Sequence, residues 1–103
     1  MRIEISSFAR IDLRKIWLYI AADSPKAATR HLRRIESRFE MFGRQPHIGE
    51  PCFDLGMGMR RHSFDNYVIY YRPTDDAVRI LRVLHGARDI EQIQFPDSES
   101  EKA

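Results

Sequence analysis

The sequence predicts a single α+β domain, with a helical hairpin packed on one face of a small, mostly antiparallel sheet. Three observations support this class. The chain has 103 residues, 43% hydrophobic and 31% charged, which suits one folded domain with a modest core. Apolar residues recur at helical spacing in the N-terminal half and at two-residue spacing in the C-terminal half. Strands cluster instead of alternating with helices, so the expected order is β-α-α-β-β-β.

The N-terminal half begins with a short strand and continues as a helix. Residues 2–5 alternate apolar and charged side chains, as a half-buried strand does. Ser6 or Ser7 can then cap a helix by accepting a hydrogen bond from its first turn. Residues 8–22 carry apolar side chains at intervals of three and four, which predicts an amphipathic helix.

A second helix should follow after a very short break. Ser24 is a good N-cap residue, and Pro25 suits the first helical position because its backbone lacks an N–H. The apolar spacing then continues to residue 42 or 43. Because the connection is so short, we expect the two helices to be antiparallel neighbours.

The C-terminal half should form the rest of the sheet. Residues 59–64 and 67–72 flank Asp65-Asn66, a reasonable two-residue hairpin turn, and residues 77–85 form a strongly apolar third strand. We expect residues 1–95 to make up the domain and the acidic residues 96–103 to be a disordered tail.

One sheet face should remain beyond the reach of the hairpin. With Arg72 opposite Val78, this far face (the sheet face away from the helices) mixes apolar residues with three arginines. A partly apolar, exposed face of this kind is typical of a partner-binding surface. Alternatively, the C-terminal residues Ile90, Ile93 and Phe95 fold back over it. The predicted far face consists of Arg61, Ser63, Val68, Tyr70, Arg72, Ile80, Arg82 and Leu84.

Composition excludes several classes of protein. The chain has a single cysteine, Cys52, which rules out an internal disulfide framework and indicates a reducing compartment. Cys52 has no neighbouring cysteine or histidine in the sequence that could complete a zinc site, so no metal is expected. No apolar run approaches the roughly 20 residues of a membrane span, and the N-terminus is no signal peptide, so a cytoplasmic location without membrane contact is expected. No cofactor-binding motif is present. The 14 arginines suggest an acidic partner.

The arginines of the second helix do not by themselves predict nucleic-acid binding. Arg30, Arg33, Arg34 and Arg38 are interleaved with acidic residues, which favours a solvated helix face. We therefore expect no direct DNA binding by this chain alone.

Several segments resemble the ParE toxins of the RelE/ParE superfamily of bacterial toxin–antitoxin modules. The most specific is Val83-Leu84-His85-Gly86-Ala87-Arg88-Asp89, preceded by Tyr67-Val68-Ile69-Tyr70-Tyr71-Arg72. Residues 9–20 are similar to the family's first helix, and Ser24-Pro25, Gln45-Pro46 and Gly58-Met59-Arg60 stand at the expected intervals. The resemblance extends to about residue 93 and implies the same helical hairpin on an antiparallel sheet.

The resemblance implies a toxin that inhibits DNA gyrase and forms a hetero-oligomer with a neutralising, ParD-like antitoxin. RelE-like relatives cleave messenger RNA on the ribosome instead, with an arginine directly after the aromatic residue that starts the middle strand. Here that position is Val68, which can neither bind phosphate nor move a proton, so we expect no enzymatic activity. Two alternatives stay open: a nontoxic antitoxin-binding module, and a ribonuclease using His62, His85, Arg61, Arg82 and Arg88.

Two partner surfaces are expected. Ile11 and Leu18 lie seven residues apart on the outer side of the first helix, where an amphipathic helix of the antitoxin can dock. An acidic continuation should cross the far face and contact Arg61, Val68, Tyr70, Arg72, Ile80 and Arg82. Arg60 and Arg88 are expected to contact the toxin's target.

Overall fold

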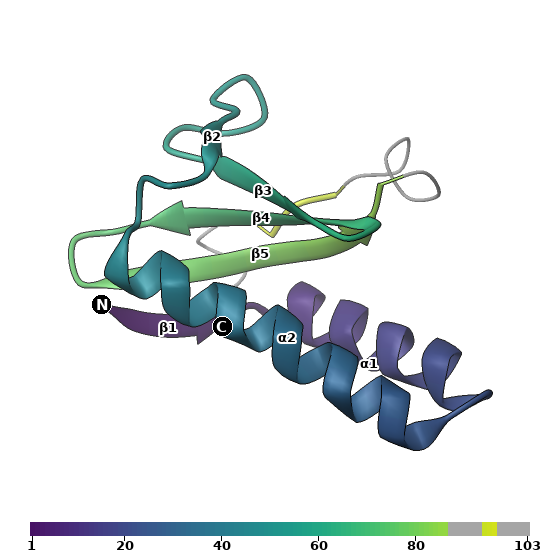
Figure 1. The fold of residues 1–103 in the computed structure, drawn as a ribbon. Helices are drawn as coiled ribbons and strands as arrows, with labels where there is room; N and C mark the ends of the chain where they lie inside the picture. Colours follow the sequence, from purple (N-terminus) through teal and green to yellow (C-terminus); the bar gives the residue numbers. More distant parts are fainter. Residues whose placement is uncertain (87–93, 97–103) are drawn as a thin grey trace.

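The computed structural model describes residues 1–86 and 94–96 and confirms the α+β class and the β-α-α-β-β-β order (Figure 1). The structure adds a two-residue strand between the helices and the predicted hairpin. The elements are β1 (Arg2–Ile5), α1 (Ser7–Ala21), α2 (Pro25–Arg44), β2 (Glu50–Pro51), β3 (Arg60–Phe64), β4 (Tyr67–Pro73) and β5 (Ala77–His85).

The five strands form one sheet in the order β1-β5-β4-β3-β2. All neighbours are antiparallel except β1 and β5, which run parallel. The predicted hairpin is confirmed, with Phe64 opposite Tyr67 across the Asp65-Asn66 turn. Asp65 has a φ of 52°, a left-handed conformation that aspartate tolerates in tight turns.

The register of β5 against β4 differs from the prediction: Arg72 lies opposite Arg79 instead of Val78, and an irregularity lies between Tyr70 and Tyr71. Tyr70 lies opposite Arg82, whereas Tyr71 lies opposite Ile80, so β5 carries one extra residue, Leu81. An extra residue reverses the alternation of side chains beyond it. Ile80 therefore turns toward the helices and is fully buried there, and the prediction that it lies on the far face is wrong.

Both helices begin as the sequence predicts and cover one face of the sheet. The Ser6 and Ser24 side chains accept hydrogen bonds from the backbone N–H groups of Ala9 and Ala27, and Pro25 occupies the first turn of α2. Between the helices and the sheet lies the main core, in which the Phe42 ring stacks on that of Tyr71 with a centroid separation of 4.1 Å.

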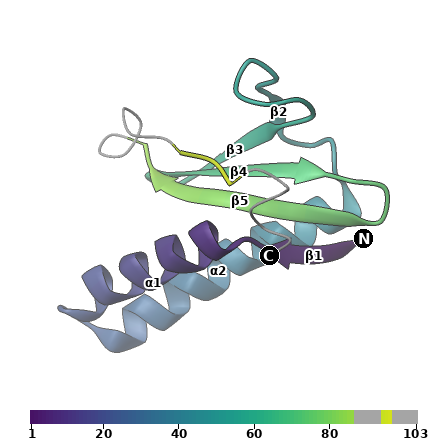
Figure 2. The same cartoon turned by 180° about the vertical axis from the view of Figure 1, so that it is seen from behind.

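The far face is largely covered by the chain itself. Cys52 and Met59, from the ends of the β2–β3 loop, form a second apolar cluster with Tyr70, Leu81 and Leu84. Phe95 packs on this cluster, edge-on to the Tyr70 ring with a centroid separation of 5.1 Å, and Figure 2 shows the 94–96 segment crossing the sheet there. The alternative of a folded-back C-terminal segment is thus correct for Phe95. Ile90 and Ile93 lie outside the described residues, as does most of the expected acidic tail, 97–103.

Candidate partner-binding site

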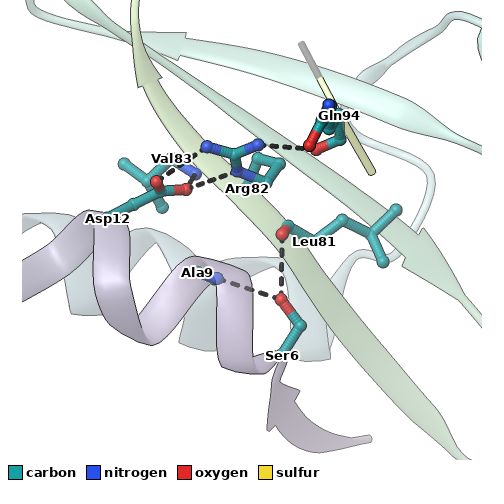
Figure 3. A network of polar contacts seen from close by, with 7 residues as sticks. All are labelled: Ser6, Ala9, Asp12, Leu81, Arg82, Val83 and Gln94. Atoms are coloured by element: carbon teal, nitrogen blue, oxygen red, sulfur yellow. Dashed lines mark hydrogen bonds and ion pairs between the residues drawn. The ribbon is translucent and has the colours of Figure 1, made fainter. Parts of the chain in front are cut away.

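The N-terminal half of α1 is fixed against the free edge of β5. Strand β1 pairs with β5 only as far as Ile80, so the following edge groups need other partners. The Ser6 hydroxyl donates to the Leu81 carbonyl at 2.9 Å, and the Asp12 carboxylate accepts from the Val83 N–H at 3.0 Å (Figure 3). These contacts set the direction of α1 and hence the position of its outer face.

Arg82 is bound within the chain. Its Nε and Nη2 donate to the two carboxylate oxygens of Asp12 at 2.8 and 2.9 Å, and its Nη1 donates to the Gln94 carbonyl at 2.6 Å (Figure 3). The side chains of Arg82 and Asp12 are only 16% and 7% exposed. Arg82 therefore ties α1, β5 and the C-terminal segment together, a role that the sequence analysis missed.

The outer face of α1 exposes apolar side chains, as predicted. Ile11 is 54% and Leu18 55% exposed, and Tyr19, which the sequence analysis did not single out, is 67% exposed. Leu18 also borders a groove of about 540 Å³ between the two helices. The groove is lined by Leu13, Arg14, Trp17, Leu18, Leu32 and Glu36. This face can accept an apolar helix from a partner.

Of the residues predicted to meet the antitoxin on the far face, two are inaccessible. Ile80 is fully buried among the helices' core residues, and Tyr70 is 2% exposed because Phe95 and the loop cluster cover it. Val68 is half-buried at the rim of that cluster. The prediction that Tyr70 and Ile80 contact the antitoxin is therefore wrong for this arrangement of the chain.

The arginines at the other end of the sheet lie near β2 and the β2–β3 loop. Arg61 forms an ion pair with Glu50 at 3.3 Å, and Arg72 Nε donates to the Met57 carbonyl at 3.1 Å. Arg60 Nη1 donates to the Gly49 carbonyl at 2.8 Å, and its guanidinium lies 5.9 Å from the centre of the Phe53 ring. Arg72 and Arg60 thus contact the β2–β3 loop, whereas Arg61 pairs with β2.

The residues considered for ribonuclease chemistry do not converge in the described part of the chain. His62 packs edge-on against the Phe42 ring, and burial together with nearby Arg38 lowers the pKa of His62 below its ordinary value. His85 packs against Tyr67. Arg61, on β3, is paired with Glu50 on β2. Arg82 lies two strands away from Arg61, on β5, and is held by Asp12 of α1. Acid–base cleavage needs such groups around one phosphate.

Three further expectations concern Arg88, metal binding and membrane insertion. Arg88, a candidate for target binding and for ribonuclease chemistry, lies outside the described residues. Among residues 1–86 and 94–96, no three histidine, cysteine or acidic side chains gather in a way that could hold a metal ion. Neither α1 nor α2 is long and apolar enough to cross a membrane.

A family model for the ParE toxin of the type II toxin–antitoxin system parDE matches residues 3–90. The chain belongs to the ParE toxin family. Toxin ParE1 of Caulobacter vibrioides is 33% identical over 82 residues, covering 79% of this chain and 84% of that toxin. Toxin ParE3 of the same organism is 35% identical over 65 residues, covering 63% of this chain and 65% of that toxin.

A more distant ParE relative and a solved structure extend this similarity. Toxin ParE1 of Mycobacterium tuberculosis is 27% identical over 66 residues, covering 63% of this chain and 67% of that toxin. A structure described as the chromosomal ParDE system from P. aeruginosa matches with a TM-score of 0.69 at 18% identity, covering 82% of this chain and 95% of that one. The structural match supports the ParE fold. Family membership agrees with the expectation of a toxin that is not an enzyme.

Proposed function

We propose that this ParE-family chain acts in the cytoplasm by binding and inhibiting DNA gyrase, and that a ParD-like antitoxin neutralises it in a hetero-oligomer. The match of residues 3–90 to the ParE family carries the proposal. Two features of the chain support binding over cleavage. Val68 stands where RelE-like enzymes carry an arginine, and the candidate acid–base residues that are described face different neighbours.

The antitoxin should dock first on the outer face of α1. Ile11 and Leu18 are both more than half exposed there, and the groove beside Leu18 can receive a further apolar side chain. Fewer far-face residues are then available to the antitoxin than the sequence suggests. Arg61, Val68 and Arg72 remain candidates, whereas Arg82 already binds Asp12. An acidic antitoxin segment suits the arginines, since Arg–carboxylate pairs are directional and strong.

Calorimetric titration with the cognate antitoxin tests this surface. Leu18→Asp should weaken binding by well over tenfold, because it places an unpaired charge against the partner's apolar residues. The fold should be unaffected, since Leu18 is 55% exposed. Lys26→Asp, on the exposed start of α2, is a matched control that should bind normally. Full affinity of a folded Leu18→Asp variant would exclude α1 as the antitoxin site.

Expression of the chain without its antitoxin separates the proposed function from its alternatives. Gyrase inhibition should arrest growth and induce the DNA-damage response while transcripts stay intact. Codon-linked transcript cleavage would establish the ribonuclease alternative instead. Normal growth with normal antitoxin binding would indicate a nontoxic binding module. In the same assay, unchanged toxicity of a folded Arg88→Ala variant would remove Arg88 from the target-binding surface.

A further inference from the structure

We propose that this chain binds its target protein through the loop between β2 and β3, an inference that rests on the proposed function. Three apolar side chains of this 53–57 loop are exposed: Phe53 by 54%, Leu55 by 41% and Met57 by 90%. Exposed apolar side chains clustered in one short segment commonly mark an interaction site.

The 53–57 loop is held in one shape by its own backbone. Cys52 N–H donates to the Met59 carbonyl at 2.9 Å and closes the loop at its base. Within the loop, Leu55 N–H donates to the Cys52 carbonyl and Gly56 N–H to the Phe53 carbonyl. A loop ordered before binding loses little conformational entropy when a partner docks on it.

The base of the loop is anchored in the second apolar cluster. Cys52 and Met59 are 5% and 1% exposed, so the residues flanking the loop are core residues. Arg72 adds a hydrogen bond from its Nε to the Met57 carbonyl. Gly58 follows with a φ of 74°, a conformation that glycine adopts without strain. The chain therefore directs Phe53, Leu55 and Met57 outward from a rigid frame.

The position of the loop makes it independent of the proposed antitoxin helix site. Figure 1 shows the β2–β3 loop beyond one edge of the sheet, while α1 lies on the opposite side of the molecule, and Figure 2 agrees from behind. A partner helix lying along α1 is therefore on the other side of the molecule from the β2–β3 loop. The molecule thus presents two separate apolar surfaces, which suits a protein with two different partners.

The charges around the loop define the chemistry of the partner. Arg72 and Arg60 contact the loop, and Arg61 acts electrostatically on Cys52 at its base, whereas the acidic residues nearby are Glu50, which pairs with Arg61, and Asp54. An arginine has five N–H donors, and the described contacts of Arg60 and Arg72 use only Nη1 and Nε respectively. The complementary surface is therefore an apolar pocket bordered by carboxylates, with Met57 and Phe53 as the inserted anchors.

The same arginines suggest how the antitoxin would exclude the target. Arg61 and Arg72 remain candidates for the antitoxin's acidic distal segment, and Arg72 directly contacts the loop. An antitoxin that is anchored on α1 and extends to Arg72 would occupy the border of the loop. Target and antitoxin would then compete at this border, although their apolar anchors lie at opposite ends of the molecule.

The experiment compares two folded variants in two assays. Met57→Asp should raise the toxin concentration needed for half-inhibition of gyrase supercoiling by about tenfold or more, since truncation of an anchor residue commonly has effects of this size. Its affinity for the antitoxin should fall much less than that of Leu18→Asp, because the antitoxin's apolar helix binds α1 and only its acidic distal segment reaches Arg72 beside the loop. Leu18→Asp should show the reverse, with weakened antitoxin binding and normal gyrase inhibition. Phe53→Ser provides a second loop variant if Met57→Asp fails to fold.

The outcomes separate this inference from the proposed function. If the wild-type chain inhibits gyrase and both folded loop variants inhibit it equally well, the loop is not the target surface and the proposed function stands. If the wild-type chain does not inhibit gyrase, the proposed function fails and this inference fails with it. Sedimentation that shows a wild-type dimer dissociated by Met57→Asp, with inhibition unchanged, would assign the loop to self-association and overturn the inference.

Discussion

Removal of the Asp12 carboxylate should destabilise the domain more than most single substitutions at polar positions. Asp12 accepts two hydrogen bonds from the Arg82 guanidinium and one from the Val83 N–H. In Asp12→Ala all three donors lose their acceptor at once. The Arg82 side chain, 16% exposed in the intact protein, is left beside a helix that no longer carries a compensating charge.

The expected loss is about 3 kcal/mol. Removing one member of a buried ion pair typically costs about 3–5 kcal/mol, because the remaining charge stays poorly solvated. The lower end applies here, since Arg82 keeps some contact with solvent and its bond to the Gln94 carbonyl. For a domain of this size, about 3 kcal/mol lowers the Tm by about 15 °C. That is a large part of the roughly 5–15 kcal/mol that stabilises a typical domain.

Urea unfolding of four proteins measures this effect: wild type, Asp12→Ala, Arg82→Met and the double variant. The double variant should be more stable than the sum of the single losses predicts, because no unpaired charge remains. Glu36→Ala, an exposed position on α2, is the control and should change stability by less than about 0.5 kcal/mol. An Asp12→Ala variant within about 0.5 kcal/mol of wild type would show that the Asp12–Arg82 pair does not stabilise the fold.

Two further predictions concern the core and its pH dependence. Tyr71→Phe should cost about 2 kcal/mol in urea unfolding, because the Gly49 N–H and the Pro46 carbonyl both lose the phenol oxygen as partner; a loss below about 0.5 kcal/mol would contradict this. The pKa of His62 is lower in the folded protein than in the unfolded chain, so the unfolded chain binds a proton more readily than the folded one. His62 therefore makes its full contribution to the free energy of unfolding above pH 6.5. This contribution falls as the pH drops from 6.5 toward the folded-state pKa. His62→Gln should flatten the stability curve below pH 6.5 relative to wild type, and parallel curves for the two proteins would contradict this.

The elements that sequence predicts well are those with local signals. Ser24 and Pro25 mark the start of α2, and the Asp65-Asn66 turn fixes the hairpin register, because capping and turn geometry depend on residues close in the chain. The exposure of Ile11 and Leu18 is likewise confirmed, since it follows from the direction of the apolar stripe on α1. Their role toward an antitoxin stays a prediction.

The features that sequence did not reveal depend on distant residues. The extra residue at Leu81 has no local signature, yet it moves Ile80 from the far face into the main core. The contact between Asp12 and Arg82 joins positions 70 residues apart. One signal for it was present: Asp12 lies three residues after Ala9 and four before Ile16, next to the buried stripe, where an unpaired charge would be costly.

We propose that this ParE-family chain is a non-catalytic inhibitor of DNA gyrase. The most direct test titrates the purified chain into a gyrase supercoiling reaction, with and without its cognate antitoxin, and incubates the same preparation with translating ribosomes. We expect supercoiling to be lost in proportion to the toxin added, to be restored by antitoxin, and messenger RNA to remain intact. Full supercoiling activity at a large excess of folded toxin, together with messenger RNA cleavage, would contradict the account.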